Sequence, residues 1–101
     1  MYTVKKFPYG TFSWADLIST DQAAAREFYT QLMGWGTADV PMGNDQMYTF
    51  FTVDGHNVGA VGPMPQQMRD HGHPSVWNNY ITVDDVDALV DKVTAAGGKV
   101  I

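Results

Sequence analysis

The sequence predicts an α+β fold, in which a βαβββ module is followed by an incomplete second module of the βαβ(ββ) type. Three observations favour this fold: two strand-to-helix patterns with an aspartate at each helix start, a two-residue turn between β-prone runs, and a 64-residue offset that aligns the two patterns. We expect an N-terminal arm at residues 1–10, a first module at 11–66, a linker loop at 67–75 and the start of a truncated second module at 76–101.

The first strand-to-helix pattern opens with an apolar, β-prone stretch from Thr11 to Ser19. Thr20 or Asp21 follows as the expected N-cap, because a side-chain oxygen at this position accepts a hydrogen bond from a free amide of the first helical turn. Gly34 stands where a helix ends in a left-handed C-cap. The apolar residues between these limits recur at helical spacing and are expected to face the core: Ala24, Ala25, Phe28 and Leu32.

A hairpin is the clearest local signal in the middle of the chain. Gln46–Val53 and His56–Val61 are β-prone runs, and Asp54-Gly55 separates them. This dipeptide favours a type I′ turn, since both central positions of that turn need a positive φ. A shorter strand is expected before the hairpin, over Trp35–Val40, and residues 41–44 are expected to end it.

The second strand-to-helix pattern begins with a predicted strand over Val76–Val83. Asp84 or Asp85 is expected to cap the helix that follows, and Gly97-Gly98 to end it. One more strand is expected to begin at Lys99–Ile101. The apolar residues on one face of this helix are Val86, Leu89, Val90 and Val93.

An offset of 64 positions aligns the two patterns, placing Asp21 on Asp85 and Gly34 on Gly98. A complete second copy would end near residue 126, about 25 residues beyond Ile101. Strands without neighbours leave unpaired amides and carbonyls at a sheet edge. We therefore expect a partner chain, a swapped segment or residues of a longer parent protein to cover that edge.

Composition narrows the possible functions. The net charge is −5 and the six basic residues are scattered, which argues against a nucleic-acid partner because phosphate backbones are bound by clustered Lys and Arg. The absence of cysteine excludes disulfides, thiolate nucleophiles and Cys-ligated metals. No apolar run approaches the roughly 20 residues of a membrane span, and the first residues lack the apolar stretch of a signal peptide. A cytoplasmic protein with no membrane partner is the resulting expectation.

Four short motifs resemble the vicinal oxygen chelate superfamily, which includes glyoxalases, bleomycin-resistance proteins and extradiol dioxygenases. They are Arg26–Tyr29, Leu32–Trp35, Val83–Leu89 and the Trp77-Asn78 pair, which is similar to tandem-module members of actinobacterial type. The resemblance extends over residues 10–101. It implies two βαβββ units whose strands form a cup around a small-molecule site.

The resemblance also implies a divalent metal held by two His or Gln residues and two carboxylates, but this chain departs from that set. One ligand position lies on the first strand of each unit, and these positions hold Trp14 and Asn78. A carboxylate ligand is expected within residues 59–62, but the sequence there is Gly-Ala-Val-Gly. An indole N–H only donates, and an amide oxygen suits a hard ion at best. The fourth ligand position lies beyond Ile101. We therefore expect no metal and no other cofactor to be bound in the family manner by this chain alone.

Strand alternation places Asp16 on the same face as the first ligand position. Asp16 is the best acid–base candidate, because loss of solvent around a carboxyl group favours its protonated form and suits it to proton transfer near neutral pH. The residues of matching parity that are expected to bind a ligand are Phe12, Trp14, Asn78 and Tyr80. The alternative is that the aromatic residues fill the core and that the polar ones form structural hydrogen bonds.

Three functions remain open at this point. The first is a small-molecule-binding module that lacks the usual metal ligands, either a binding or resistance-type protein or part of an enzyme. The second is a metal-dependent lyase, isomerase or dioxygenase whose site is completed by a partner chain or by missing residues. The third is a structural fragment or an assembly module. A homodimer or a swapped oligomer that completes the sheet is the expected assembly.

Overall fold

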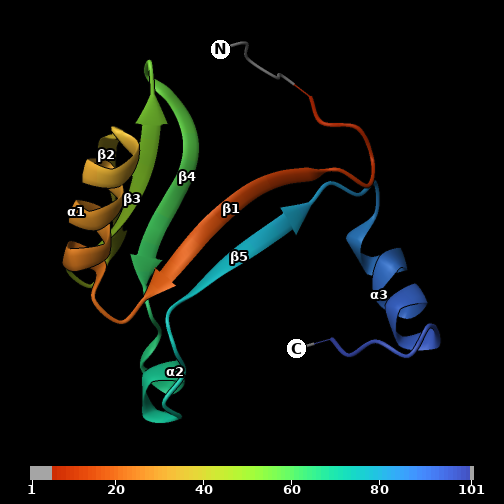
Figure 1. The fold of residues 1–101 in the computed structure, drawn as a ribbon. Helices are drawn as coiled ribbons and strands as arrows, with labels where there is room; N and C mark the ends of the chain where they lie inside the picture. Colours follow the sequence, from red (N-terminus) through yellow and green to blue (C-terminus); the bar gives the residue numbers. More distant parts are fainter. Residues whose placement is uncertain (1–5, 101) are drawn as a thin grey trace. The chain divides into compact units, whose positions relative to one another are not determined.

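The computed structural model describes residues 6–100 (Figure 1). The elements are β1 (Phe12–Ser19), α1 (Gln22–Met33), β2 (Gly36–Gly43), β3 (Gln46–Val53), β4 (His56–Pro63), α2 (Gln66–Asp70), β5 (Val76–Ile81) and α3 (Val86–Ala95). The described residues form two compact units: a larger one of residues 14–79, and a smaller one made of residues 6–13 and 80–100. The predicted α+β class is confirmed, while the predicted domain boundaries stay predictions.

The strands form one sheet in the order β2-β3-β4-β1-β5. β3 pairs antiparallel with both β2 and β4, whereas β1 pairs parallel with β4. The register places Ala60 of β4 opposite Asp16 on one side and opposite Phe50 on the other. Because paired residues share a face of a sheet, Asp16 and Phe50 lie on the same face.

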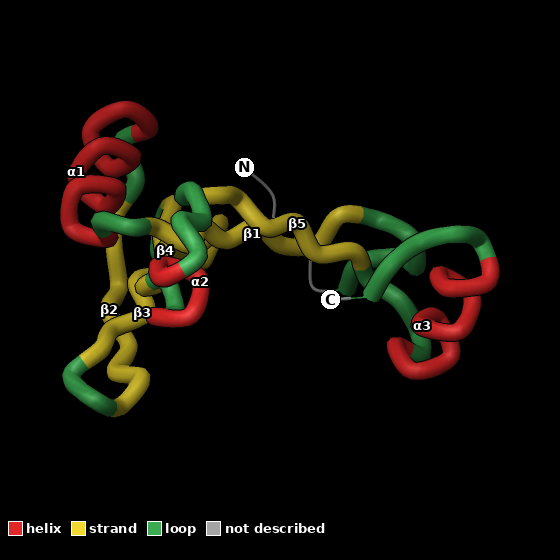
Figure 2. Tube along the Cα trace, turned by 90° about the horizontal axis from the view of Figure 1, so that it is seen from below, coloured by secondary structure: helices red, strands yellow, loops and turns green. Residues whose placement is uncertain are grey.

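Helix α1 covers the other face of the larger unit's sheet. Figures 1 and 2 both show α1 lying along one side of β2, β3 and β4. The core beneath the helix consists of Leu17, Phe51 and Val61. Gln22 ties the start of the helix to the sheet, since its side-chain amide donates to the backbone oxygens of Met47 at 2.7 Å and Val61 at 3.1 Å.

The helical residues that pack against this core correct part of the sequence prediction. Ala25 and Tyr29, one turn apart, contact the core. Ala24, Phe28 and Leu32 were also expected to face it, but all three are exposed, Phe28 by 57% and Leu32 by 63%. The amphipathic stripe is broad enough to allow either line of residues, and the packing of α1 on the sheet selects the line through Ala25 and Tyr29.

The two aspartate caps are present as predicted. Asp21 accepts a hydrogen bond from the Ala24 amide at 3.0 Å, and Asp85 accepts one from the Ala88 amide at 3.1 Å. Gly34 takes the left-handed C-cap of α1, with a φ of 69°. In the second pattern the positive φ falls on Gly97, at 92°, one position before the residue that the 64-residue offset aligns with Gly34.

The predicted Asp54-Gly55 turn is confirmed, with φ values of 51° and 79° that suit a type I′ turn. A second turn of the same kind was missed at Asn44-Asp45, where φ is 51° and 59°. β2 therefore runs on to Gly43 instead of ending at Val40. Its proline at position 41 is tolerated because β2 is an edge strand and its register is irregular between Pro41 and Gly43.

Two other sequence predictions were wrong. The expected linker loop contains the short helix α2, whose Gln66 side chain donates to Asp70 at 2.8 Å. The expected final strand does not form at residues 99–100, and Ile101 lies outside the described residues. Both errors concern segments too short for a hydrophobic period to be recognised.

Candidate functional site

The candidate site lies on the sheet face opposite α1, which we call the Asp16 face and define by Trp14, Asp16, Tyr48 and Phe50. All four side chains are half-buried and all belong to the larger unit. β1 supplies the first two residues and β3 the other two. Their alternation with the core residues Leu17 and Phe51 places the four side chains on one face.

The polar centre of the Asp16 face is a hydrogen bond between two strands that are not neighbours. The hydroxyl of Tyr48 donates to Oδ2 of Asp16 at 2.9 Å. Gly62 of β4 makes room for this contact, because a Cβ atom there would lie 3.2 Å from a ring carbon of Tyr48. This hydrogen bond has ordinary O–H···O geometry and holds the Asp16 side chain in a defined orientation.

Aromatic rings flank this hydrogen bond. Phe50 packs edge-to-face against Tyr48, with ring centroids 5.1 Å apart, and against Trp14, with centroids 6.0 Å apart. Such contacts stabilise the arrangement beyond the burial of apolar area and hold the rings in fixed positions. The result is an ordered aromatic surface that contains one carboxylate.

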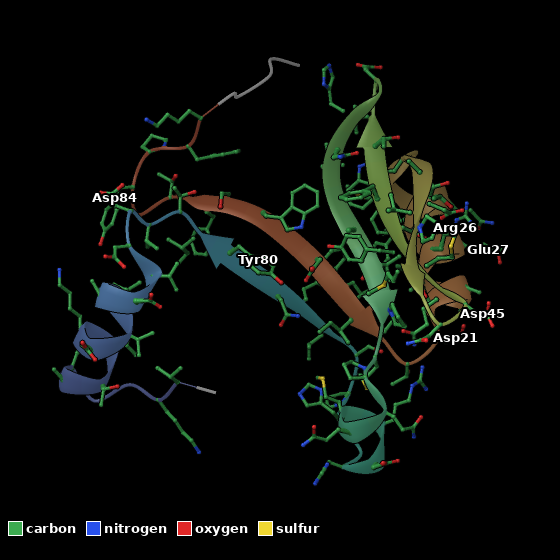
Figure 3. The ribbon with its side chains drawn as sticks, turned by 180° about the vertical axis from the view of Figure 1, so that it is seen from behind. Asp21, Arg26, Glu27, Asp45, Tyr80 and Asp84 are labelled. Atoms are coloured by element: carbon green, nitrogen blue, oxygen red, sulfur yellow. The ribbon has the colours of Figure 1, made fainter. Side chains whose placement is uncertain are left out.

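The other sequence-predicted residues are placed as follows. Trp77 of β5 points toward α1, because its indole Nε1 donates to the Tyr29 hydroxyl at 3.1 Å. Strand alternation therefore turns its neighbour Asn78 toward the Asp16 face. Phe12 and Tyr80 belong to the smaller unit, where Ser13 donates its hydroxyl to the backbone oxygen of Tyr80 at 3.4 Å (Figure 3 labels Tyr80).

Sequence reasoning therefore missed Tyr48 and Phe50. Both lie in the Gln46–Val53 run that was recognised as a strand, and their shared parity within it was visible. Which strand would lie beside them was not visible, because the parallel pairing of β1 with β4 joins segments more than 40 residues apart. The register of that pairing brings Tyr48 within reach of Asp16.

The side chains present do not fit the metal that the resemblance implies. Trp14, at the first ligand position, offers only an N–H donor, and β4 offers no ligating side chain at residues 59–62. Among residues 6–100, no group of three or more His, Asp or Glu side chains could hold a metal ion. The Asp16 face offers a carboxyl group that accepts a hydrogen bond and aromatic rings that can stack on a ligand.

Comparison with known proteins agrees with this architecture. Residues 11–101 match the Glyoxalase/Bleomycin resistance protein/Dioxygenase superfamily. The chain belongs to this superfamily. Within the described residues, none of the helices is both long and apolar enough to cross a membrane.

Similar proteins occur in actinobacteria. The chain is 51% identical over 92 residues to CFP32, named as a candidate glyoxylase, of Mycobacterium bovis and of Mycobacterium tuberculosis, a match that covers 90% of this chain and 35% of the relative. It is 39% identical over 106 residues to the anthracycline biosynthesis protein DnrV of Streptomyces peucetius, covering 95% of this chain and 38% of that protein. The chain thus spans little more than a third of the length of these relatives.

Proposed function

We propose that the chain is a cytoplasmic small-molecule-binding module of this superfamily, of the binding or resistance type, which holds its ligand on the Asp16 face without the usual metal ligands. The observation that carries this proposal is the Tyr48–Asp16 hydrogen bond, set among the rings of Trp14 and Phe50. An apolar surface with a few oriented polar groups is what recognition of a small molecule requires.

The chemistry of the Asp16 face suits a planar aromatic ligand that carries a hydrogen-bond donor or a cationic group. Rings such as those of Trp14 and Phe50 stack on planar ligands and attract cations, and a carboxylate accepts hydrogen bonds. The names of the Streptomyces relatives, which are anthracycline biosynthesis proteins, support a polycyclic aromatic ligand. Asp16 would also be the group that accepts or returns a proton if the ligand reacts.

Titration with doxorubicin, an anthracycline with a fused ring system and an ammonium group, tests this proposal. Saturable binding is expected, with a change in the indole N–H signal of Trp14 in a ¹H–¹⁵N spectrum. Asp16→Asn keeps the shape of the side chain and removes its charge, so it should weaken binding at least tenfold. Asp45→Asn, at the exposed turn between β2 and β3 (Figure 3), is the matched control and should leave binding unchanged.

Metal analysis of the same protein decides the role of a metal. The proposal expects doxorubicin binding to be the same before and after treatment with a strong chelator. It is overturned if the purified protein holds about one tightly bound divalent ion per chain and loses this ion in Asn78→Ala.

A second candidate function is a metal-dependent lyase, isomerase or dioxygenase whose site is completed by other residues. The observation that favours it is the coverage of the relatives, of which this chain spans 35–38%. Activity is then expected only in an assembly or in a longer chain, and only with added metal. Activity that survives a strong chelator would exclude this candidate.

For the assembly, we propose a homodimer or a swapped oligomer that covers the sheet edge. β5 is the last strand in the sheet order, and Ile81 at its end is 50% exposed. Unpaired strand edges recruit further strands. Light scattering tests this idea, and a monomer at all concentrations up to the millimolar range would exclude it.

A further inference from the structure

An open, shallow pocket of about 400 Å³ lies on the helix side of the larger unit, on the opposite side of the sheet from the Asp16 face. We call it the helix-side cavity. Its lining comes from β1, the turn into α1, α1 itself and the start of β5: Leu17, Ser19, Thr20, Asp21, Ala24, Ala25, Phe28, Tyr29, Ser75 and Trp77. The volume lies within the usual range for small-molecule sites.

Aromatic rings in a fixed arrangement form the apolar wall of the helix-side cavity. Trp77 stands at 84° to Tyr29 with centroids 5.2 Å apart, and its Nε1 donates to the Tyr29 hydroxyl at 3.1 Å. Phe28 stands at 87° to the same ring, with centroids 4.9 Å apart. Phe28 and Trp77 nevertheless keep 57% and 37% of their surface exposed. The wall is therefore ordered before any ligand arrives, and it still offers apolar area to one.

Hydroxyl groups form the polar end of the same cavity. Ser75 accepts a hydrogen bond from the Thr20 amide at 3.0 Å, and the hydroxyl oxygens of the two residues lie 3.2 Å apart. Each of the two hydroxyl groups carries one proton, and the contact between them uses only one of the two. The other proton can be donated to a ligand. Tyr29, whose hydroxyl oxygen accepts from Trp77, supplies a second hydroxyl proton. The cavity thus presents donors beside an aromatic wall.

Charge restricts the ligand further. Asp21 is the one carboxylate that lines the helix-side cavity, and no Lys, Arg or His side chain lines it. The chain as a whole carries a net charge of −5. An anionic ligand would meet repulsion from Asp21. Arg69 does not line the cavity, but its Nη2 donates to the backbone oxygen of Thr20 at 2.9 Å and offsets part of this repulsion. We infer that the helix-side cavity is a second binding site, which takes an uncharged planar aromatic molecule with a hydrogen-bond-accepting oxygen.

This inference does not depend on the proposed function, because the two sites report through different indole groups. In a ¹⁵N-labelled sample of the full chain, the N–H signals of Trp14, Trp35 and Trp77 can be assigned with single Trp→Phe variants. Titration with 2-naphthol is expected to shift the Trp77 signal saturably, with an affinity that Asp16→Asn leaves unchanged. A shift at Trp14 with none at Trp77 would overturn the inference, and so would a change that does not saturate.

Two variants and one further compound sharpen this test. Phe28→Ala should weaken 2-naphthol binding at least tenfold, and a dispersed spectrum verifies that the variant is folded. Leu32→Ala is the matched control, because Leu32 lies on the same helix and is 63% exposed but does not line the cavity. The anion 2-naphthoate should bind at least tenfold more weakly than 2-naphthol.

The opposing result would be that a second protein chain, and not a small molecule, covers the helix-side cavity. If light scattering shows a dimer that Phe28→Ala dissociates, and 2-naphthol does not shift the Trp77 signal, the cavity is part of an interface and the inference fails. Equal affinity of Phe28→Ala and the unaltered protein for 2-naphthol would also reject it.

Discussion

Tyr48 and Asp16 are joined by a 2.9 Å hydrogen bond across the intervening strand β4, and this contact is the polar centre of the Asp16 face. Tyr48→Phe keeps the ring and removes this hydrogen bond. A bond to a charged group contributes more than one between neutral groups, so we expect a loss of about 1–2 kcal/mol in the free energy of unfolding. Urea denaturation measures it, and a change below about 0.3 kcal/mol would contradict the structural role of the bond.

The packing of the core predicts that truncating two large apolar residues of the larger unit will lower the free energy of unfolding by very different amounts. Phe51 is fully buried and packs against Trp35 with ring centroids 5.0 Å apart, whereas Leu32 is 63% exposed. Phe51→Ala should cost about 3–5 kcal/mol, a large part of the stability of a small domain. Leu32→Ala should change stability by less than about 1 kcal/mol. If the two substitutions lowered the urea midpoint equally, the assignment of Phe51 to the core and of Leu32 to the surface would be wrong.

The caps at Asp21 and Asp85 predict local effects on two different helices. Asp21→Ala should cost about 1 kcal/mol and raise hydrogen exchange at the Ala24 amide, because that amide loses its acceptor. Asp85→Ala should do the same at the Ala88 amide. Asparagine substitutions keep an accepting oxygen and serve as controls. Protection that stays unchanged in both alanine variants would mean that these caps contribute nothing to helix stability.

The turn at Asp54-Gly55 predicts a penalty that comes from backbone conformation alone. Gly55 has a φ of 79° and open space where a Cβ atom would lie, so Gly55→Ala introduces strain without a steric clash. A loss of about 1 kcal/mol is expected, because residues with a Cβ atom disfavour this conformation. Asp54→Asn should be close to neutral, since asparagine tolerates the left-handed region. Thermal unfolding compares the two variants, and an equal melting temperature for both would refute the turn assignment.

Local chemistry let the sequence determine several elements of this protein. Asp21, Gly34 and Asp54-Gly55 each act through hydrogen bonds or backbone preferences within a few residues, so their roles could be predicted without knowing the fold. The helix α2 and the turn at Asn44-Asp45 escaped prediction for the opposite reason. Each is only a few residues long, and the neighbouring prolines suggested that regular structure ends there.

Only the tertiary structure decided what the site is made of. The sequence placed Trp14 and Asp16 on one face of a strand, but it could not show that Tyr48 would donate to Asp16. That contact depends on the parallel pairing of β1 with β4 and on the antiparallel pairing of β4 with β3. Register in such pairings is set by burial of one whole face against α1, which involves residues far apart in the chain. A single sequence carries no direct record of which distant segments become neighbours, so the partner of the central carboxylate is visible only in the folded chain.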